Sequence, residues 1–219
     1  PREKFIVIPN SYDPERINLN KIHQSNRFRR DDRFTMTYVG NFMNLRSPEP
    51  LFKALSLMNA EEEDLNKKIL LNLVGNLHEH KHLISEYGLQ EIVNVSPPII
   101  HNEVFTYLLS SDLLLLIDAP AHSMCLATKL VEYIFTGKPI LAITSETGAA
   151  AGVVKATNTG TIVSPSDVAA IRNAIEKFRE DFSKGMLIVK PNSHEVAKYQ
   201  TRNCASEFVK TLNELPTRS

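Results

Sequence analysis

Short apolar segments alternate along the chain with longer segments in which apolar residues recur every three or four positions. The short segments are rich in leucine, isoleucine and valine, and most end near a glycine or a proline, as strands do. Strands are therefore predicted at residues 5–8, 34–39, 69–74, 92–95, 113–117, 139–143 and 161–163.

The longer segments predict helices between these strands. The clearest begins at about Pro48, because Ser47 can cap it and proline suits the first helical position. Its Leu51, Leu55 and Met58 share one face. Further helices are predicted at residues 77–87, 102–109, 129–136, 167–178 and 193–215.

Regular alternation of strand and helix from residue 34 onward predicts an α/β fold: a Rossmann-like, doubly wound parallel sheet of six strands with helices on both faces. Right-handed crossovers favour the strand order 3-2-1-4-5-6, in which the chain changes direction between the strands at 34–39 and 113–117. Ligands bind at the carboxyl ends of those two strands. The loops at residues 40–47 and 118–129 are therefore the predicted binding loops.

This pattern divides the 219 residues into three segments. Residues 1–33 are predicted to form an interdomain strand and a linker, residues 34–190 the Rossmann-like domain, and residues 191–219 a C-terminal helix. Because the chain opens with Pro1 directly before a strand-like run, we expect it to be a portion of a longer protein.

Composition and charge narrow the classes of function. Apolar residues make up 42% of the chain and charged residues 23%, an ordinary globular balance that argues against disorder. The 25 basic residues equal the 25 acidic ones, so no overall field favours nucleic acid as a partner. Two cysteines, Cys125 and Cys204, form no disulfide framework, which indicates a cytoplasmic protein. The longest apolar run, residues 113–117, is too short to span a bilayer.

One local cluster of charge, made by Arg27, Arg29, Arg30 and Arg33, could contact anionic lipid. Two aspartates lie within it, so a solvated linker is the favoured interpretation. Peripheral contact with a membrane is the alternative.

The two predicted binding loops carry residues suited to an anion. Gly40 ends its strand without a side chain, and Arg46 precedes a helix amino terminus, where free N–H groups and the helix dipole favour negative charge. In the second loop Thr128 can cap a helix that begins at Lys129, and Glu132 lies on the same face as Lys129. The simpler alternative is a turn at Gly40 and a surface ion pair between Lys129 and Glu132, worth only about 0.2–0.5 kcal/mol. Their position at the carboxyl ends of the central strands favours the functional interpretation.

Several segments resemble one family, the glycosyl transferases group 1, which have the GT-B fold. The most specific is residues 128–141, TKLVEYIFTGKPIL, which is similar to the family segment sKlxEYlaxGkPil. Residues 7–13, VIPNSYD, resemble the viPNGvD that joins the acceptor domain to the donor domain in this family. The family's first loop is similar to residues 38–41, YVGN, together with Arg46, six positions after the glycine. Two further family segments resemble residues 111–115 and 163–167.

The resemblance implies that residues 34–190 bind a nucleotide-diphosphate sugar, with Arg46 and Lys129 on the diphosphate and Glu132 on the ribose. It implies a hexosyltransferase-like glycosyltransferase of glycan biosynthesis, whose sugar or lipid-linked acceptor is held by an N-terminal domain missing from this chain. No catalytic residue is expected here, because a catalytic base would come from the missing domain. No cofactor is expected either. The chain alone is therefore expected to be inactive. The expected substrate-binding residues are Gly40, Asn41, Arg46, Thr128, Lys129, Leu130 and Glu132.

The sequence also departs from the family pattern. Many members carry two glutamates with seven residues between them around this segment; the second corresponds to Glu132, but Met124 occupies the place of the first. Asn41 replaces an arginine often found after the glycine, and Ser11 replaces the usual glycine of the linker. In the family the first glutamate lies near the sugar, so its loss indicates altered sugar contacts or a less typical donor.

Metal chemistry is not expected. No Asp-x-Asp pair occurs, and His78 and His82, although they would share a helix face, lack a third and fourth ligand. Two alternatives to a transferase remain open at this stage: a non-catalytic nucleotide-sugar-binding scaffold subunit, which Met124 favours, and a nucleotide-sugar epimerase.

Overall fold

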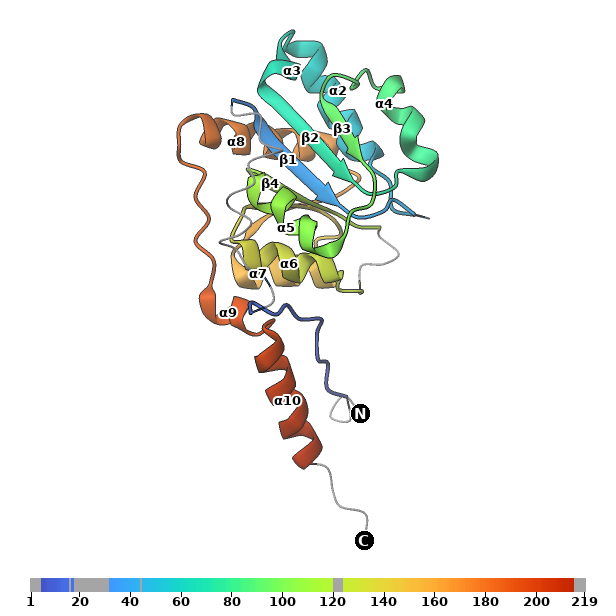
Figure 1. Ribbon diagram of the computed structural model, residues 1–219. Coiled ribbons are helices and arrows are strands. Elements are labelled where there is room, and N and C mark those ends of the chain that lie inside the picture. Colours follow the sequence, from blue (N-terminus) through green and yellow to red (C-terminus); the bar gives the residue numbers. More distant parts are fainter. Residues whose placement is uncertain (1–4, 16, 18–31, 44, 120–123, 215–219) are drawn as a thin grey trace.

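The computed structural model describes residues 5–15, 17, 32–43, 45–119 and 124–214. They form a six-stranded sheet, all of whose pairings are parallel, in the order β3-β2-β1-β4-β5-β6 (Figure 1). The predicted doubly wound Rossmann-like order is confirmed. The strands are β1 (Phe34–Val39), β2 (Ile69–Val74), β3 (Val93–Ser96), β4 (Leu113–Ile117), β5 (Ile140–Ile143) and β6 (Gly160–Val163).

Helices follow the strands along the chain. Their bounds are α2 (Glu49–Glu61), α3 (Leu65–Lys68), the 3₁₀ helix η2 (His78–His82), α4 (Leu83–Glu86), α5 (His101–Ser110), α6 (Thr128–Thr136), α7 (Ala149–Thr157), α8 (Val168–Ser183), α9 (Ser193–Ala197) and α10 (Thr201–Asn213). None of the helices in the described ranges is long and apolar enough to cross a membrane.

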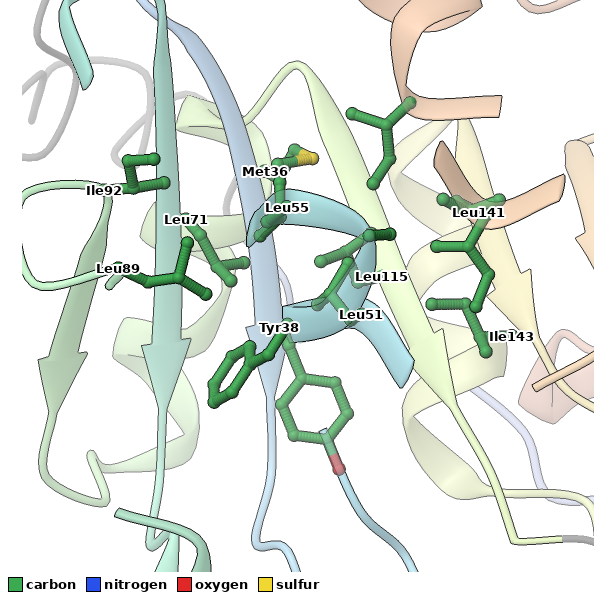
Figure 2. Close-up of a cluster of buried hydrophobic side chains, with 14 of the residues drawn as sticks. Met36, Tyr38, Leu51, Leu55, Leu71, Leu89, Ile92, Leu115, Leu141 and Ile143 are labelled. Carbon is green, nitrogen blue, oxygen red and sulfur yellow. The ribbon is translucent and has the colours of Figure 1, made fainter. Parts of the chain in front are cut away.

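The sheet is buried on both faces, which explains why β4 and β5 are apolar at every position. In β4, Leu115 packs into the cluster that contains α2 and α8, whereas its neighbours Leu114 and Leu116 pack into the cluster that contains α6 and α7. Figure 1 shows α5 and α6 on one side of the sheet and α2 and α8 on the other. Figure 2 shows the first of these clusters, in which Leu51 and Leu55 of α2 lie over the middle strands.

The predicted strand at residues 5–8 is wrong. These residues take no regular secondary structure, and Phe5 and Val7 are 79% and 88% exposed. An apolar run becomes a strand only where a neighbour supplies hydrogen bonds, and in the described residues this segment bonds to no sheet edge. Tyr12 alone forms an isolated bridge, with Gln200.

That bridge also divides the predicted C-terminal helix. Thr201 N–H donates to the carbonyl of Tyr12 at 2.9 Å, and Tyr12 N–H donates to the carbonyl of Tyr199 at the same distance. The helical path therefore breaks between α9 and α10, because extended backbone is needed at Gln200 to pair with Tyr12. The prediction of a helix over residues 193–215 is therefore correct in type but wrong in continuity over the described part of that range.

Residues of the predicted linker thus contact the domain. The Tyr12 ring packs on Phe135 of α6 with ring centroids 4.7 Å apart. Asn10 Nδ2 donates to the carbonyl of Leu126 and to Oγ1 of Thr128, both at 3.2 Å. The linker-like segment is therefore bonded directly to the second predicted binding loop. The arginines at positions 27, 29 and 30 lie outside the described residues.

Candidate functional site

The first binding loop leaves β1 through Gly40, whose backbone has φ +135°. Its N–H donates to the carbonyl of Val74 at 2.8 Å. A Cβ at position 40 would lie 2.5 Å from Nζ of Lys129 and 3.5 Å from the hydroxyl of Tyr38. The positive φ favours glycine at this position, and a Cβ there would displace the end of the Lys129 side chain.

Lys129, at the second position of α6, reaches back across the sheet edge to β1. Its Nζ donates to the Tyr38 hydroxyl at 2.9 Å and lies 4.0 Å from the centre of the Tyr38 ring. Burial, and secondarily the positive charge of Arg46, lower the pKa of Lys129 to about 7, although Asp118 and Glu132 act in the opposite direction.

Arg46 joins the two binding loops. Its guanidinium donates to Oδ1 of Asp118 at 3.0 Å, and Asp118 directly follows β4. The Asp118 side chain is 3% exposed and that of Arg46 23%, so this pair is screened from water far better than a surface pair. Within the described residues, the Arg46 Nε is buried without a hydrogen-bond partner.

Sequence reasoning missed Tyr38 and Asp118. Tyr38 is fully buried, its ring stacks on Phe42 at 4.3 Å, and burial raises the pKa of its hydroxyl. Figure 2 shows its hydroxyl pointing toward the carboxyl ends of the strands. Asp118 could have been found from its position alone, since it is the first residue after the strand at 113–117. Tyr38 gave no such signal, because its pattern is that of a core residue.

The start of α6 differs in part from the prediction. Thr128 is the first helical residue and Ala127 is the cap position, so capping by Thr128 is wrong. The Thr128 hydroxyl instead accepts a hydrogen bond from Asn10. The Leu130 side chain is fully buried in the core, and its N–H donates to the carbonyl of Ala127 at 3.0 Å. A role for Leu130 in binding would therefore be one of support, through its packing.

Glu132 pairs with a residue that the sequence did not single out. Its Oε1 lies 2.6 Å from Nε2 of His101, at the start of α5. The Glu132 side chain is 15% exposed and that of His101 is 68% exposed. Because Lys129 donates to Tyr38 instead, the alternative of a plain surface ion pair between Lys129 and Glu132 is not what the structure shows.

Asn41 ties the first loop to the loop after β2. Its Oδ1 accepts from the N–H of Asn76 at 2.9 Å. The two loops approach so closely that a Cβ at Gly75 would lie 2.3 Å from the carbonyl oxygen of Gly40. Asn41, which stands where the family often has an arginine, thus supports the loop backbone.

Met124 is 83% exposed, in the second loop before α6. A thioether cannot accept hydrogen bonds from sugar hydroxyls as a carboxylate does. Among the described residues no three His, Cys, Asp or Glu side chains are grouped as a metal ion requires.

The fold is a Rossmann-like α/β domain with positively charged side chains at the point where its strand order reverses. Two cationic side chains from two loops, each near the amino terminus of a helix, meet at the carboxyl edge of the sheet where its strand order reverses.

The chain belongs to the glycosyl transferases group 1 family, which it matches over residues 20–199. It is 25% identical over 160 residues to a D-inositol 3-phosphate glycosyltransferase of Paenarthrobacter aurescens (strain TC1), a match that covers 69% of this chain and 37% of that protein.

Solved structures share the fold. Sucrose-phosphate synthase from Thermosynechococcus elongatus superposes with a TM-score of 0.75 at 20% identity, over 95% of this chain and 52% of that one. Anabaena HepE, solved in complex with UDP-glucose, superposes with a TM-score of 0.72 at 18% identity, over 98% of this chain and 59% of that one. The chain therefore spans about half the length of these solved structures.

Proposed function

We propose that this chain is the donor-binding domain of a glycosyltransferase, and that its site at the carboxyl edge of β1 and β4 binds a nucleotide-diphosphate sugar. The observation that carries the proposal is the position of the Lys129 amine beside Gly40, which lacks a side chain, with Arg46 near enough to lower the pKa of that amine. Family membership supports the class of reaction. The HepE complexes with UDP and UDP-glucose make UDP the first nucleotide to test.

The diphosphate would lie between Arg46 and Lys129. Arg46 has its Nε available, and the Lys129 amine is buried at the edge of the sheet. The amino termini of α2 and α6 add backbone N–H groups. When the bond from the sugar to the diphosphate breaks, negative charge grows on the leaving diphosphate, and these fixed positive groups would stabilise it.

The ribose would bind at Glu132. A carboxylate can accept two hydroxyl hydrogen bonds, and a ribose offers adjacent 2′ and 3′ hydroxyls. His101 contacts Oε1 of Glu132, and the other carboxylate oxygen remains for the ligand. Because the His101 side chain is mostly exposed, it can also turn away when a ligand takes its place.

The acceptor, a sugar or a lipid-linked sugar, would bind to a further domain that completes the cleft. The chain spans about half the length of its solved relatives, and no described residue is assigned as a catalytic base. A specific observation supports one second candidate: Met124, in place of a glutamate near the sugar, is consistent with a scaffold subunit that binds the nucleotide sugar without turnover.

Isothermal calorimetry of the chain with UDP and with uridine tests the proposal. Charge-assisted hydrogen bonds contribute about 1.5–3 kcal/mol each, so UDP should bind at least about tenfold more tightly than uridine. ADP and GDP, titrated alongside, identify the base. Equal affinity for diphosphate and nucleoside, or no binding of any of the three diphosphates, would show that the cluster is not a donor site.

A further inference from the structure

Tyr38 is the residue that the Lys129 amine contacts directly. The lysine amine donates to the Tyr38 hydroxyl and lies over the ring, so that one residue holds it in two ways. The ring is itself fixed, because it is fully buried and stacks on Phe42. The hydroxyl also interacts with Arg46 and makes a long contact, 3.4 Å, with the carbonyl oxygen of Asn41. The Tyr38 ring is therefore held in place at the end of β1.

The sheet sets the position of Tyr38. Tyr38 is the second-to-last residue of β1 and pairs with Leu73 of β2, so its Cα cannot shift without disturbing two central strands. Lys129 comes from the other half of the fold, after the crossover to β4. The contact between them therefore spans the point where the strand order reverses.

The charges around the Lys129 amine come from every neighbouring element. Arg46 of the first loop opposes its positive charge, whereas Asp118 after β4 and Glu132 of α6 favour it. Asp118 forms an ion pair with Arg46, and Glu132 forms one with His101. The direct partner of each carboxylate is therefore a residue other than Lys129. The Tyr38 hydroxyl is left as the direct hydrogen-bond partner of the amine.

We infer that Tyr38 is a positioning residue of the donor site: it holds the Lys129 amine where the diphosphate arrives, and binding of the diphosphate adds a proton from solvent to that amine. The inference rests on the proposed function and extends it, because it makes donor binding dependent on pH through one lysine. Tyr38 acts through Lys129 and touches no reacting atom.

The expected pH dependence follows from the charge states. In the empty site, burial lowers the pKa of Lys129 to about 7, so near neutral pH the amine is only partly protonated. Two phosphate groups beside it raise that pKa again, so the bound form carries the proton. Affinity for diphosphate should fall as pH rises above about 7, and each binding event should take up close to one proton at about pH 8.

Tyr38→Phe is the decisive change, because it keeps the stacked ring and removes only the hydroxyl. The Lys129 ammonium loses its direct acceptor, so its pKa in the empty site falls further. The affinity for UDP at about pH 7.5 should fall roughly three- to tenfold and recover at about pH 6, while affinity for uridine stays unchanged. Tyr87→Phe is the matched control, since the Tyr87 hydroxyl donates to Glu49 at 3.0 Å and not to Lys129.

Two measurements test the inference. Calorimetry with UDP in buffers of different ionisation enthalpy counts the protons taken up by wild type and both variants. NMR titration of the Lys129 Cε resonance without ligand gives the midpoint of its protonation directly, which we expect near pH 7 in wild type and lower in Tyr38→Phe.

The outcomes separate the two claims. If wild type binds UDP but the NMR midpoint and proton uptake are unchanged in Tyr38→Phe, the role of Tyr38 is refuted and the proposed function stands. An equal loss of UDP affinity at every pH, shared with uridine, would also refute it, because that is what a structural residue would give. If wild type binds no nucleotide diphosphate, the proposed function and this inference fall together.

Discussion

Replacing Lys129 with methionine should stabilise the protein while it weakens donor binding. Methionine has a similar length, carries no charge and packs well against an aromatic ring such as Tyr38. In the wild type the amine occupies a buried position that disfavours its charged form, so that its pKa lies at about 7 instead of 10.5. The substitution removes that unfavourable charge together with a ligand of the diphosphate.

The magnitude follows from the pKa. At about 1.4 kcal/mol per pH unit, the lowered pKa corresponds to at most about 5 kcal/mol of unfavourable free energy when the amine is charged. Lys129 retains partial exposure, so solvent reduces this to about 1–3 kcal/mol. For a domain of this size we expect an increase in melting temperature of roughly 2–10 °C at about pH 6. Loss of one charge-assisted contact should weaken UDP binding about tenfold or more.

The sign of the pH dependence is fixed by linkage. Between about pH 7 and pH 10.5 the unfolded chain holds the Lys129 proton and the folded chain does not. The contribution of Lys129 to the free energy of unfolding of the wild type therefore increases as the pH rises through this range. The advantage of Lys129→Met should therefore be largest below about pH 7 and shrink toward about pH 10.

Thermal unfolding of both proteins across this pH range, with calorimetry against UDP and uridine, measures both effects. Lys177→Met is the control, because Lys177 is exposed on α8 and pairs with Asp181 in its own helix. A lower melting temperature for Lys129→Met at about pH 6, or a gain that is the same at every pH, would refute the burial argument. Unchanged UDP affinity would refute the role of Lys129 in the site.

Three further predictions concern the same site. Glu132→Gln should weaken UDP more than 2′-deoxy-UDP with little change in thermal stability, and equal affinity for both nucleotides in wild type and variant alike would show that Glu132 does not bind the ribose. Gly40→Ala should displace the Lys129 amine and weaken UDP binding about tenfold or more. Gly88 also has a positive φ but has open space around it, so Gly88→Ala should leave UDP affinity unchanged. Equal UDP affinities in the two variants would refute the steric argument. The chain alone should bind UDP but show no acceptor-dependent transfer in a radiolabelled-sugar assay, and sustained transfer would contradict the proposed division between two domains.

The sheet and its order could be predicted because each depends on local pattern and chain handedness. The leucine run at 113–117 is apolar at every position, as a strand buried on both faces must be, and this marked β4. The helix α7 was missed, because AAAGVVKAT has little helical periodicity and contains a glycine. The run at 5–8 resembles a strand in composition, but sequence alone does not reveal whether a partner strand lies beside it.

The candidate site was predictable in its loops but not in its contacts. Arg46 and Lys129 could be placed at the switch point from topology alone. Their partners could not, because Tyr38 looks like a core residue and His101 lies 31 positions from Glu132. Whether Lys129 bonds to Glu132 or to Tyr38 depends on how closely α6 approaches β1, which is a tertiary property.

A crystal structure of the chain with UDP, or with whichever diphosphate calorimetry selects, tests the central claim most directly. We predict that the diphosphate lies within hydrogen-bond distance of Arg46 Nε and Lys129 Nζ, next to Gly40, with the ribose hydroxyls on Glu132. A nucleotide bound elsewhere, with Lys129 still on the Tyr38 hydroxyl and Arg46 untouched, would contradict the assignment of this cluster as the donor site.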